Sequence, residues 1–120
     1  MNQNILIVDD EIGIRLLLED LLESEGFSIL TAKNGQEALD IISKNAIDLM
    51  IIDYKLPKVD GIEVLMQLAH ENKQIDTIVM SGLVENIQEE ITELANVKKI
   101  LSKPFDVLEV RDYVKQHLAN

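Results

Sequence analysis

Cysteine and tryptophan are both absent from this sequence, and aromatic residues make up only 3% of it. Without cysteine the chain has no disulfide, no thiolate metal site and no thiol nucleophile, which fits a reducing compartment. Residues 1–8 carry no basic segment of the kind that begins a signal peptide, and no apolar run is long enough to span a bilayer. We therefore expect a cytoplasmic protein with an aliphatic core.

Basic residues are also scarce, since 11 lysines and arginines stand against 22 aspartates and glutamates, for a net charge of −11. A surface this acidic repels the phosphates of nucleic acids and anionic lipids, so we expect the chain to bind neither. It suits a metal cation or a basic patch on a partner protein. The 120 residues, 47% of them hydrophobic, suffice for one compact core. We expect a single monomeric domain over residues 1–120, with no output domain.

Five short apolar runs recur along the chain, and each is followed by polar or turn-forming residues. Unbroken apolar runs of this length are typical of strands that are buried on both faces of a parallel sheet. The runs cover residues 5–8, the more mixed 28–32, and then 49–52, 77–80 and 99–101.

Helical patterns separate these runs. Gly26 stands where a helix over residues 11–25 needs a left-handed residue after its end. The other helix signals are capping residues and apolar stripes: Asn34 with Glu37, Asp60 ahead of Ile62, Leu65, Met66 and Ala69, the stretch 84–95, and Asp106 with Glu109 at the start of 107–118.

Strands and helices that alternate in this way predict an α/β fold of the flavodoxin-like, doubly wound type. Right-handed crossovers place helices on both faces of a parallel sheet, which gives a three-layer (βα)5 sandwich. The commonest winding has the strand order 2-1-3-4-5. In such a sheet the ligand site lies at the carboxyl ends of the strands, where the order reverses.

Polar residues that can carry chemistry follow four of the predicted strands. Asp9 and Asp10 follow the first strand, Asp53 the third, Ser81 the fourth and Lys103 the fifth. Taken singly, each has an ordinary structural explanation, as a helix-start carboxylate, a turn residue or a surface lysine. Taken together, they are predicted to meet at one edge of the sheet.

That combination predicts a site for phosphoryl transfer. Three carboxylates at one sheet edge repel each other unless a cation or a proton intervenes. Oxygen ligands without histidine or cysteine suit Mg²⁺, which binds through a few carboxylates and a substrate phosphate. Lys103 adds a point charge for an anionic oxygen, and Ser81 adds a hydroxyl donor. With one of the carboxylates as the nucleophile, these residues supply all the groups that phosphoryl transfer needs.

These positions, read in order, resemble the signature of bacterial response-regulator receiver domains over the whole chain. The matching motifs are Val8-Asp9-Asp10, Asp53 with Lys55-Leu56-Pro57 and Asp60-Gly61, Ser81-Gly82, and Lys103-Pro104-Phe105.

The resemblance implies a role for each of these residues. Asp53 would accept the phosphoryl group from a phosphohistidine, in a reaction that the domain catalyses on itself, and the domain would later catalyse hydrolysis of the aspartyl phosphate to inorganic phosphate. Asp9, Asp10, Asp53 and the backbone carbonyl of Lys55 would hold Mg²⁺, or Mn²⁺ in its place. The phosphoryl oxygens would be met by Ser81, the backbone N–H of Gly82 and Lys103, with a cis peptide bond between Lys103 and Pro104.

Within that family the chain is similar to single-domain intermediaries of sporulation phosphorelays, in stretches such as Gly13-Ile14-Arg15 and Asp60-Gly61-Ile62-Glu63. This similarity implies a sensor histidine kinase, a histidine phosphotransferase of the four-helix-bundle type and an aspartyl-phosphate phosphatase as partners. The residues that would meet the phosphotransferase are Gly13, Ile14, Leu17, Lys55, Pro104 and Phe105.

The first helix carries more apolar residues than one buried face needs. Ile14, Leu18, Leu21 and Leu22 form one stripe at helical spacing, which the core can absorb. Ile12, Leu16 and Leu17 fall outside that stripe. We interpret them as a docking surface beside the Asp9-Asp10 end, with packing against a loop or ordinary exposure as the alternative.

Two other functions stay open. A stand-alone receiver can act as a phosphorylation-dependent binding switch, but Ile100 stands where many receivers have the aromatic residue of such a switch. An unrelated flavodoxin or aspartate-based phosphatase is disfavoured, because Asp9-Asp10-Glu11 would repel a flavin phosphate and lacks the phosphatase spacing. The resemblance also implies that Lys55 and Leu83 occupy positions that influence attack by water on the aspartyl phosphate, and we expect these side chains to slow its hydrolysis.

Overall fold

The computed structural model describes residues 3–82, 94 and 96–118. Five parallel strands form one sheet in the order β2-β1-β3-β4-β5, which confirms the predicted winding. In chain order the strands are β1 (Asn4–Val8), β2 (Ser28–Ala32), β3 (Leu49–Asp53), β4 (Asp76–Ser81) and β5 (Val97–Ser102).

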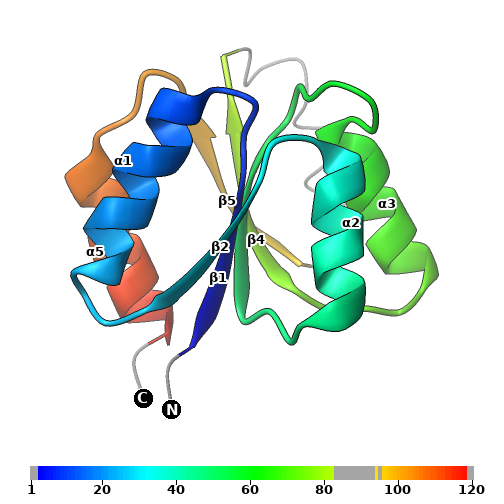
Figure 1. Cartoon of the computed structure of the whole chain (residues 1–120), viewed down its shortest axis with the longest axis horizontal. Coiled ribbons are helices and arrows are strands. Elements are labelled where there is room, and N and C mark those ends of the chain that lie inside the picture. Colours follow the sequence, from blue (N-terminus) through cyan, green and yellow to red (C-terminus); the bar gives the residue numbers. More distant parts are fainter. Residues whose placement is uncertain (1–2, 83–93, 95, 119–120) are drawn as a thin grey trace.

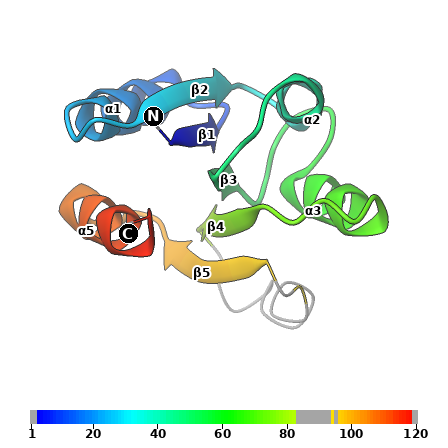
Figure 2. The same cartoon turned by 90° about the horizontal axis from the view of Figure 1, so that it is seen from below.

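Helices cover both faces of the sheet, as a doubly wound fold requires (Figure 1). One face carries α1 (Ile12–Glu23) and α5 (Val107–Leu118), and the other carries α2 (Gly35–Lys44) and α3 (Gly61–His70). The view from below shows the sheet as the middle layer between these two pairs (Figure 2). The helix predicted over 84–95, and Leu83 before it, lie outside the described residues.

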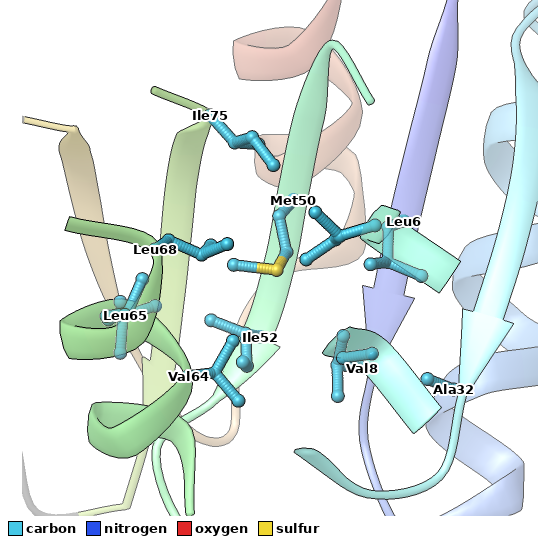
Figure 3. Packing of buried hydrophobic residues seen from close by; sticks show 12 residues of the cluster. Leu6, Val8, Ala32, Met50, Ile52, Val64, Leu65, Leu68 and Ile75 are labelled. Carbon is cyan, nitrogen blue, oxygen red and sulfur yellow. The ribbon is translucent and has the colours of Figure 1, made fainter. Parts of the chain in front are cut away.

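Strand side chains alternate between two cores, which explains why the strands read as continuous apolar runs. Leu6 and Met50 contribute to the core beneath α2 and α3, shown in Figure 3. Their neighbours Ile5 and Ile51 contribute to the core beneath α1 and α5. All four side chains are fully buried, so burial on both faces is confirmed.

The predicted helix ends are confirmed in position and partly in detail. Gly26 has a positive φ of 97° after α1. Asp60 and Glu63 form a complete capping box at the start of α3. Asn34 accepts a hydrogen bond from the backbone N–H of Glu37 at 2.8 Å, but the Glu37 side chain turns to Lys33 instead. Half of that predicted capping box is therefore wrong.

The capping box predicted at the start of α5 also differs from the prediction. Asp106 accepts its hydrogen bond from the backbone N–H of Leu108 at 2.9 Å, rather than from that of Glu109. An aspartate bonds the second or third helical amide equally well, so spacing alone does not decide between them.

The apolar face predicted for α3 needs a correction. The buried side chains are Val64, Leu65 and Leu68, whereas Met66 is 53% exposed and Ala69 is also exposed. Apolar residues cover more than half of this helix, and Glu63, Gln67 and His70 occupy the remaining face, so several apolar stripes could face the core. Gly61 restricts the rotation, because a Cβ at this position would collide with the backbone carbonyl of Asp53.

The structure confirms the buried stripe predicted for α1, in which Leu21 is half-buried, whereas the docking role of the residues outside that stripe stays a prediction. Leu18 and Leu22 are fully buried, and Ile14 packs against the same core. Ile12, Leu16 and Leu17 are 64%, 56% and 50% exposed. No helix in the described ranges is long and apolar enough to cross a membrane.

Candidate functional site

Three carboxylates meet at the carboxyl edge of the sheet. Asp9 and Asp10 follow β1, and Asp53 ends β3; one oxygen of each lies within 4.8 Å of the others. The strand register brings these carboxylates together, because β1 and β3 are paired neighbours and Val8 lies opposite Ile52. Asp9 is fully buried and Asp53 is 8% exposed, whereas Asp10 faces solvent.

Lys103 brings a cation into this cluster from the loop after β5. Its Nζ lies 2.8 Å from Oδ2 of Asp53 and 3.1 Å from Oδ2 of Asp9. The backbone N–H of Lys103 donates to the carbonyl of Ser81 at 2.8 Å, which anchors the loop to the end of β4. The predicted cis bond between Lys103 and Pro104 is present.

The protonation equilibria of this pair follow from burial and charge. Burial raises the pKa of Asp53; Lys103 lowers it through its hydrogen bond and charge, and the charge of Asp9 raises it again, leaving it above the ordinary value. Burial lowers the pKa of Lys103, but its hydrogen bonds to Asp53 and Asp9 and their charges raise it above the ordinary value overall. Lys103 therefore keeps its charge throughout the neutral range.

Asp9 is held at each of its polar atoms. Its backbone N–H donates to the carbonyl of Ala32 at 3.1 Å, and its carbonyl accepts from Nη1 of Arg15 at 2.6 Å. Oδ1 accepts from the backbone N–H of Glu11 at 2.8 Å, and Oδ2 accepts from Lys103. Asp9 is thus a fixed anchor for the turn that presents Asp10.

Sequence reasoning missed the contribution of Arg15, which ties the first turn of α1 to the end of β1. An arginine six residues after an aspartate gave no signal, because the contact is to a backbone carbonyl. Such bonds depend on where the chain runs, so side-chain type alone does not reveal them.

The loop after Asp53 is also held by hydrogen bonds. The backbone N–H of Lys55 donates to Oδ1 of Asp53 at 3.3 Å, and that of Leu56 donates to Oδ1 of Asp60 at 3.1 Å. The backbone N–H of Gly61 donates to the carbonyl of Tyr54 at 3.0 Å. These bonds hold Lys55 next to the carboxylates, with its side chain exposed.

The remaining predicted site residues lie at the same edge. Ser81 ends β4 and is 4% exposed, and Gly82 follows it at the surface. Of the predicted partner residues, Gly13, Leu17, Lys55 and Pro104 are exposed. Ile14 and Phe105 are half-buried and pack against the core beneath α1 and α5.

The donor set fits a magnesium ion. Three oxygen ligands converge without a histidine or a cysteine among them, and magnesium prefers such hard ligands. The ammonium of Lys103 already bridges two of the carboxylates. A nearby positive charge therefore stabilises the clustered negative charges.

Comparison with known proteins identifies the architecture. The family model described as "Response regulator receiver domain" matches residues 5–115. The chain belongs to this family. As a receiver domain it has a carboxylate cluster that suits Mg²⁺ and phosphoryl acceptance, and the flavodoxin and phosphatase alternatives are set aside.

Relatives of this receiver domain include both short and long proteins. Sporulation initiation phosphotransferase F of Bacillus subtilis is 43% identical over 98% of this chain and 95% of its own. The alkaline phosphatase synthesis regulator PhoP of the same organism is 36% identical over 96% of this chain but 48% of its own. The chain thus spans nearly all of the first relative and about half of the second.

A solved structure resembles this receiver domain in fold and in sequence. The response regulator TrrA of Thermotoga maritima, in complex with Mg²⁺ and BeF, superimposes with a TM-score of 0.82 at 32% identity. The match covers 97% of this chain and 99% of that one.

Proposed function

We propose that this receiver domain is a phosphorelay intermediary that accepts a phosphoryl group from a phosphohistidine onto Asp53. The observation that carries the proposal is the contact of Lys103 with both Asp53 and Asp9, beside the exposed Asp10. This arrangement combines a carboxylate nucleophile with a cation at its own oxygen, as transfer to a carboxylate requires.

The step forms one bond and breaks one. An oxygen of Asp53 attacks phosphorus, the bond between phosphorus and the donor imidazole nitrogen breaks, and that nitrogen keeps the electron pair. Lys103 binds a phosphoryl oxygen, because its Nζ is already 2.8 Å from Oδ2 of Asp53. The hydroxyl of Ser81 and the backbone N–H of Gly82 donate hydrogen bonds to the other oxygens.

Asp10, Asp53 and the backbone carbonyl of Lys55 would hold Mg²⁺, or Mn²⁺, with Asp9 directly or through water. When bound, the ion supplies positive charge that offsets the carboxylates and the phosphoryl oxygens. Asp9 fixes the turn that presents Asp10, through its four hydrogen-bonded atoms.

We further propose a single domain, working as a monomer in the cytoplasm, that receives the group from a sensor kinase and passes it to a histidine phosphotransferase. An aspartyl-phosphate phosphatase would remove it. The near full-length similarity to sporulation initiation phosphotransferase F supports this assignment. Ile100 supports relay over switching, because an aliphatic side chain gives no aromatic ring to reorient.

Leu17→Asp is expected to lower transfer to and from a four-helix-bundle phosphotransferase by roughly tenfold, the loss of one buried aliphatic contact. Leu17 is 50% exposed on α1, so the variant should fold, and phosphorylation by acetyl phosphate should not change. Radiolabel passing between the two purified proteins measures the transfer.

The matched control for this surface is Ala69→Asp. Ala69 is also an exposed apolar residue but lies on α3, across the sheet from α1. Equal transfer by Leu17→Asp and the parent chain would remove α1 from the interface. Phosphorylated chain that never returns its label to histidine would favour the binding switch.

A further inference from the structure

A groove of about 560 Å³ lies between α2 and α3, across the sheet from α1 and α5. Its apolar lining consists of the exposed residue Met66, the half-buried Leu39 and Val59, and the buried Ile42 and Leu68. Asp9, Asp10, Asp53 and Lys103 are not among its lining residues, so this groove is distinct from the carboxylate site.

The groove is negatively charged. Asp40, Glu63 and Glu71 line it, against a single lining lysine, Lys73. Lys73 pairs with Glu71 at 3.4 Å. The carboxylate of Asp40 accepts a hydrogen bond from the neutral amide of Gln36 at 3.1 Å, and that of Glu63 accepts from the backbone N–H of Asp60 at 3.3 Å. Within the described part of the chain, no lysine or arginine forms an ion pair with either of these two carboxylates.

The walls of the groove are already fixed before anything binds. Buried Ile42 holds α2 against the sheet, and buried Val64 and Leu68 hold α3. The backbone of Val59 packs closely against Gly35 at the start of α2, so closely that a Cβ at Gly35 would collide with the Val59 carbonyl. A preformed groove has little ordering cost when a partner binds.

We propose that this groove binds a basic amphipathic helix of a partner protein, with apolar side chains on Met66 and lysines or arginines facing Asp40 and Glu63. Helices α2 and α3 have 10 residues each, a length of about 15 Å, which matches roughly three turns of a docked helix. The proposal does not depend on the phosphoryl-transfer function.

Charge excludes the other large occupants. The net charge of −11 makes a second copy of this chain repel the groove, and nucleic acid and anionic lipid are repelled in the same way. A positively charged helix gains from the carboxylates at the rim and from the apolar lining together, which is the pattern of helix-in-groove recognition.

The test uses a peptide of about 14 residues, built from alanine, leucine and lysine, with leucines at helical spacing and lysines beside them. Amide chemical shifts of the ¹⁵N-labelled chain map where it binds, and their titration gives the dissociation constant. We expect the shifts to centre on Gln36, Ser43, Met66 and Glu71. A peptide of the same composition in scrambled order is expected to bind at least tenfold more weakly.

Paired charge changes separate local from overall charge. Asp40→Lys with Glu63→Gln should weaken binding about tenfold, since one attractive rim pair becomes repulsive and the other is lost, while Gln keeps the capping bond of α3. Asp20→Lys with Glu23→Gln makes the same charge change on the exposed side of α1 and should change the constant less than threefold. Met66→Ser, at an exposed position, should weaken binding without altering charge.

Three results would overturn the proposal. Shifts that centre on Ile12, Leu16 and Leu17 would show that the peptide prefers α1. Equal weakening by both paired charge changes would reduce the effect to overall charge. Equal binding of the scrambled peptide would show that no helical apolar stripe is recognised.

Discussion

Lys103→Met is expected to lower the rate of phosphorylation by acetyl phosphate by at least ~100-fold, the usual cost of removing one charge-stabilising donor from a reacting centre. The ammonium lies 2.8 Å from the proposed attacking carboxylate, and its pKa is raised by Asp53 and Asp9. It is therefore charged at every pH at which the reaction would be measured. Intact-mass spectra over time give the rate.

The same variant is expected to bind Mg²⁺ more tightly than the parent chain. Lys103 and a metal cation compete for the same carboxylates, so loss of the ammonium removes a competitor. Slow transfer together with tighter metal binding excludes a collapsed site as the cause. Lys44→Met, at an exposed position on α2, is the matched control, and an unchanged rate in Lys103→Met would contradict the role given to the lysine.

Asp10→Asn is expected to raise the Mg²⁺ concentration for half-maximal phosphorylation by at least ~100-fold. Outer partners of metal ligands already change affinity by about 10- to 100-fold when they are replaced, so a charged ligand should matter at least as much. Asp10 is the solvent-facing member of the cluster. The rate should recover in part at high Mg²⁺, because Asp53 remains intact.

Asp20→Asn is the matched control for that experiment, since Asp20 is exposed on α1, the helix that follows Asp10, and lies away from the cluster. Calorimetric titration with Mg²⁺ measures the affinity without relying on the reaction. An Asp10→Asn chain with the affinity of the parent would show that the ion is held by other groups.

The parallel sheet could be predicted because its central strands, β1, β3 and β4, are buried on both faces, and its order is the commonest winding of such a sheet. Runs such as 49–52 are unbroken, and the structure buries Leu49, Met50, Ile51 and Ile52 completely. The carboxylate cluster followed from the same pattern, since parallel neighbours bring their carboxyl ends to one edge. Local composition and topology were enough for both.

The rotation of α3 and the details of the caps could not be predicted. Apolar residues cover more than half of α3, so the sequence alone does not show that Met66 points outward, whereas the close approach of Gly61 to the Asp53 carbonyl restricts how the helix can rotate. Contacts to backbone atoms are equally hidden, as with Arg15 and the Asp9 carbonyl. These features depend on how segments far apart in the sequence pack against each other, and the periodicity of one segment gives no information about that packing.

The groove between α2 and α3 follows from that same rotation. Had the predicted stripe been correct, Met66 would be buried and the groove would lose its exposed apolar residue. Such a surface can be recognised only when the structure shows which face of the helix points outward.

The most direct test of the proposed function is the intact mass of the chain after incubation with acetyl phosphate or phosphoramidate, with and without Mg²⁺, beside an Asp53→Asn variant. We predict one added phosphoryl group on the parent chain, only with Mg²⁺, and none on the variant. Uptake that survives in Asp53→Asn, or no uptake by the parent chain from either donor, would contradict the assignment of Asp53 as the acceptor.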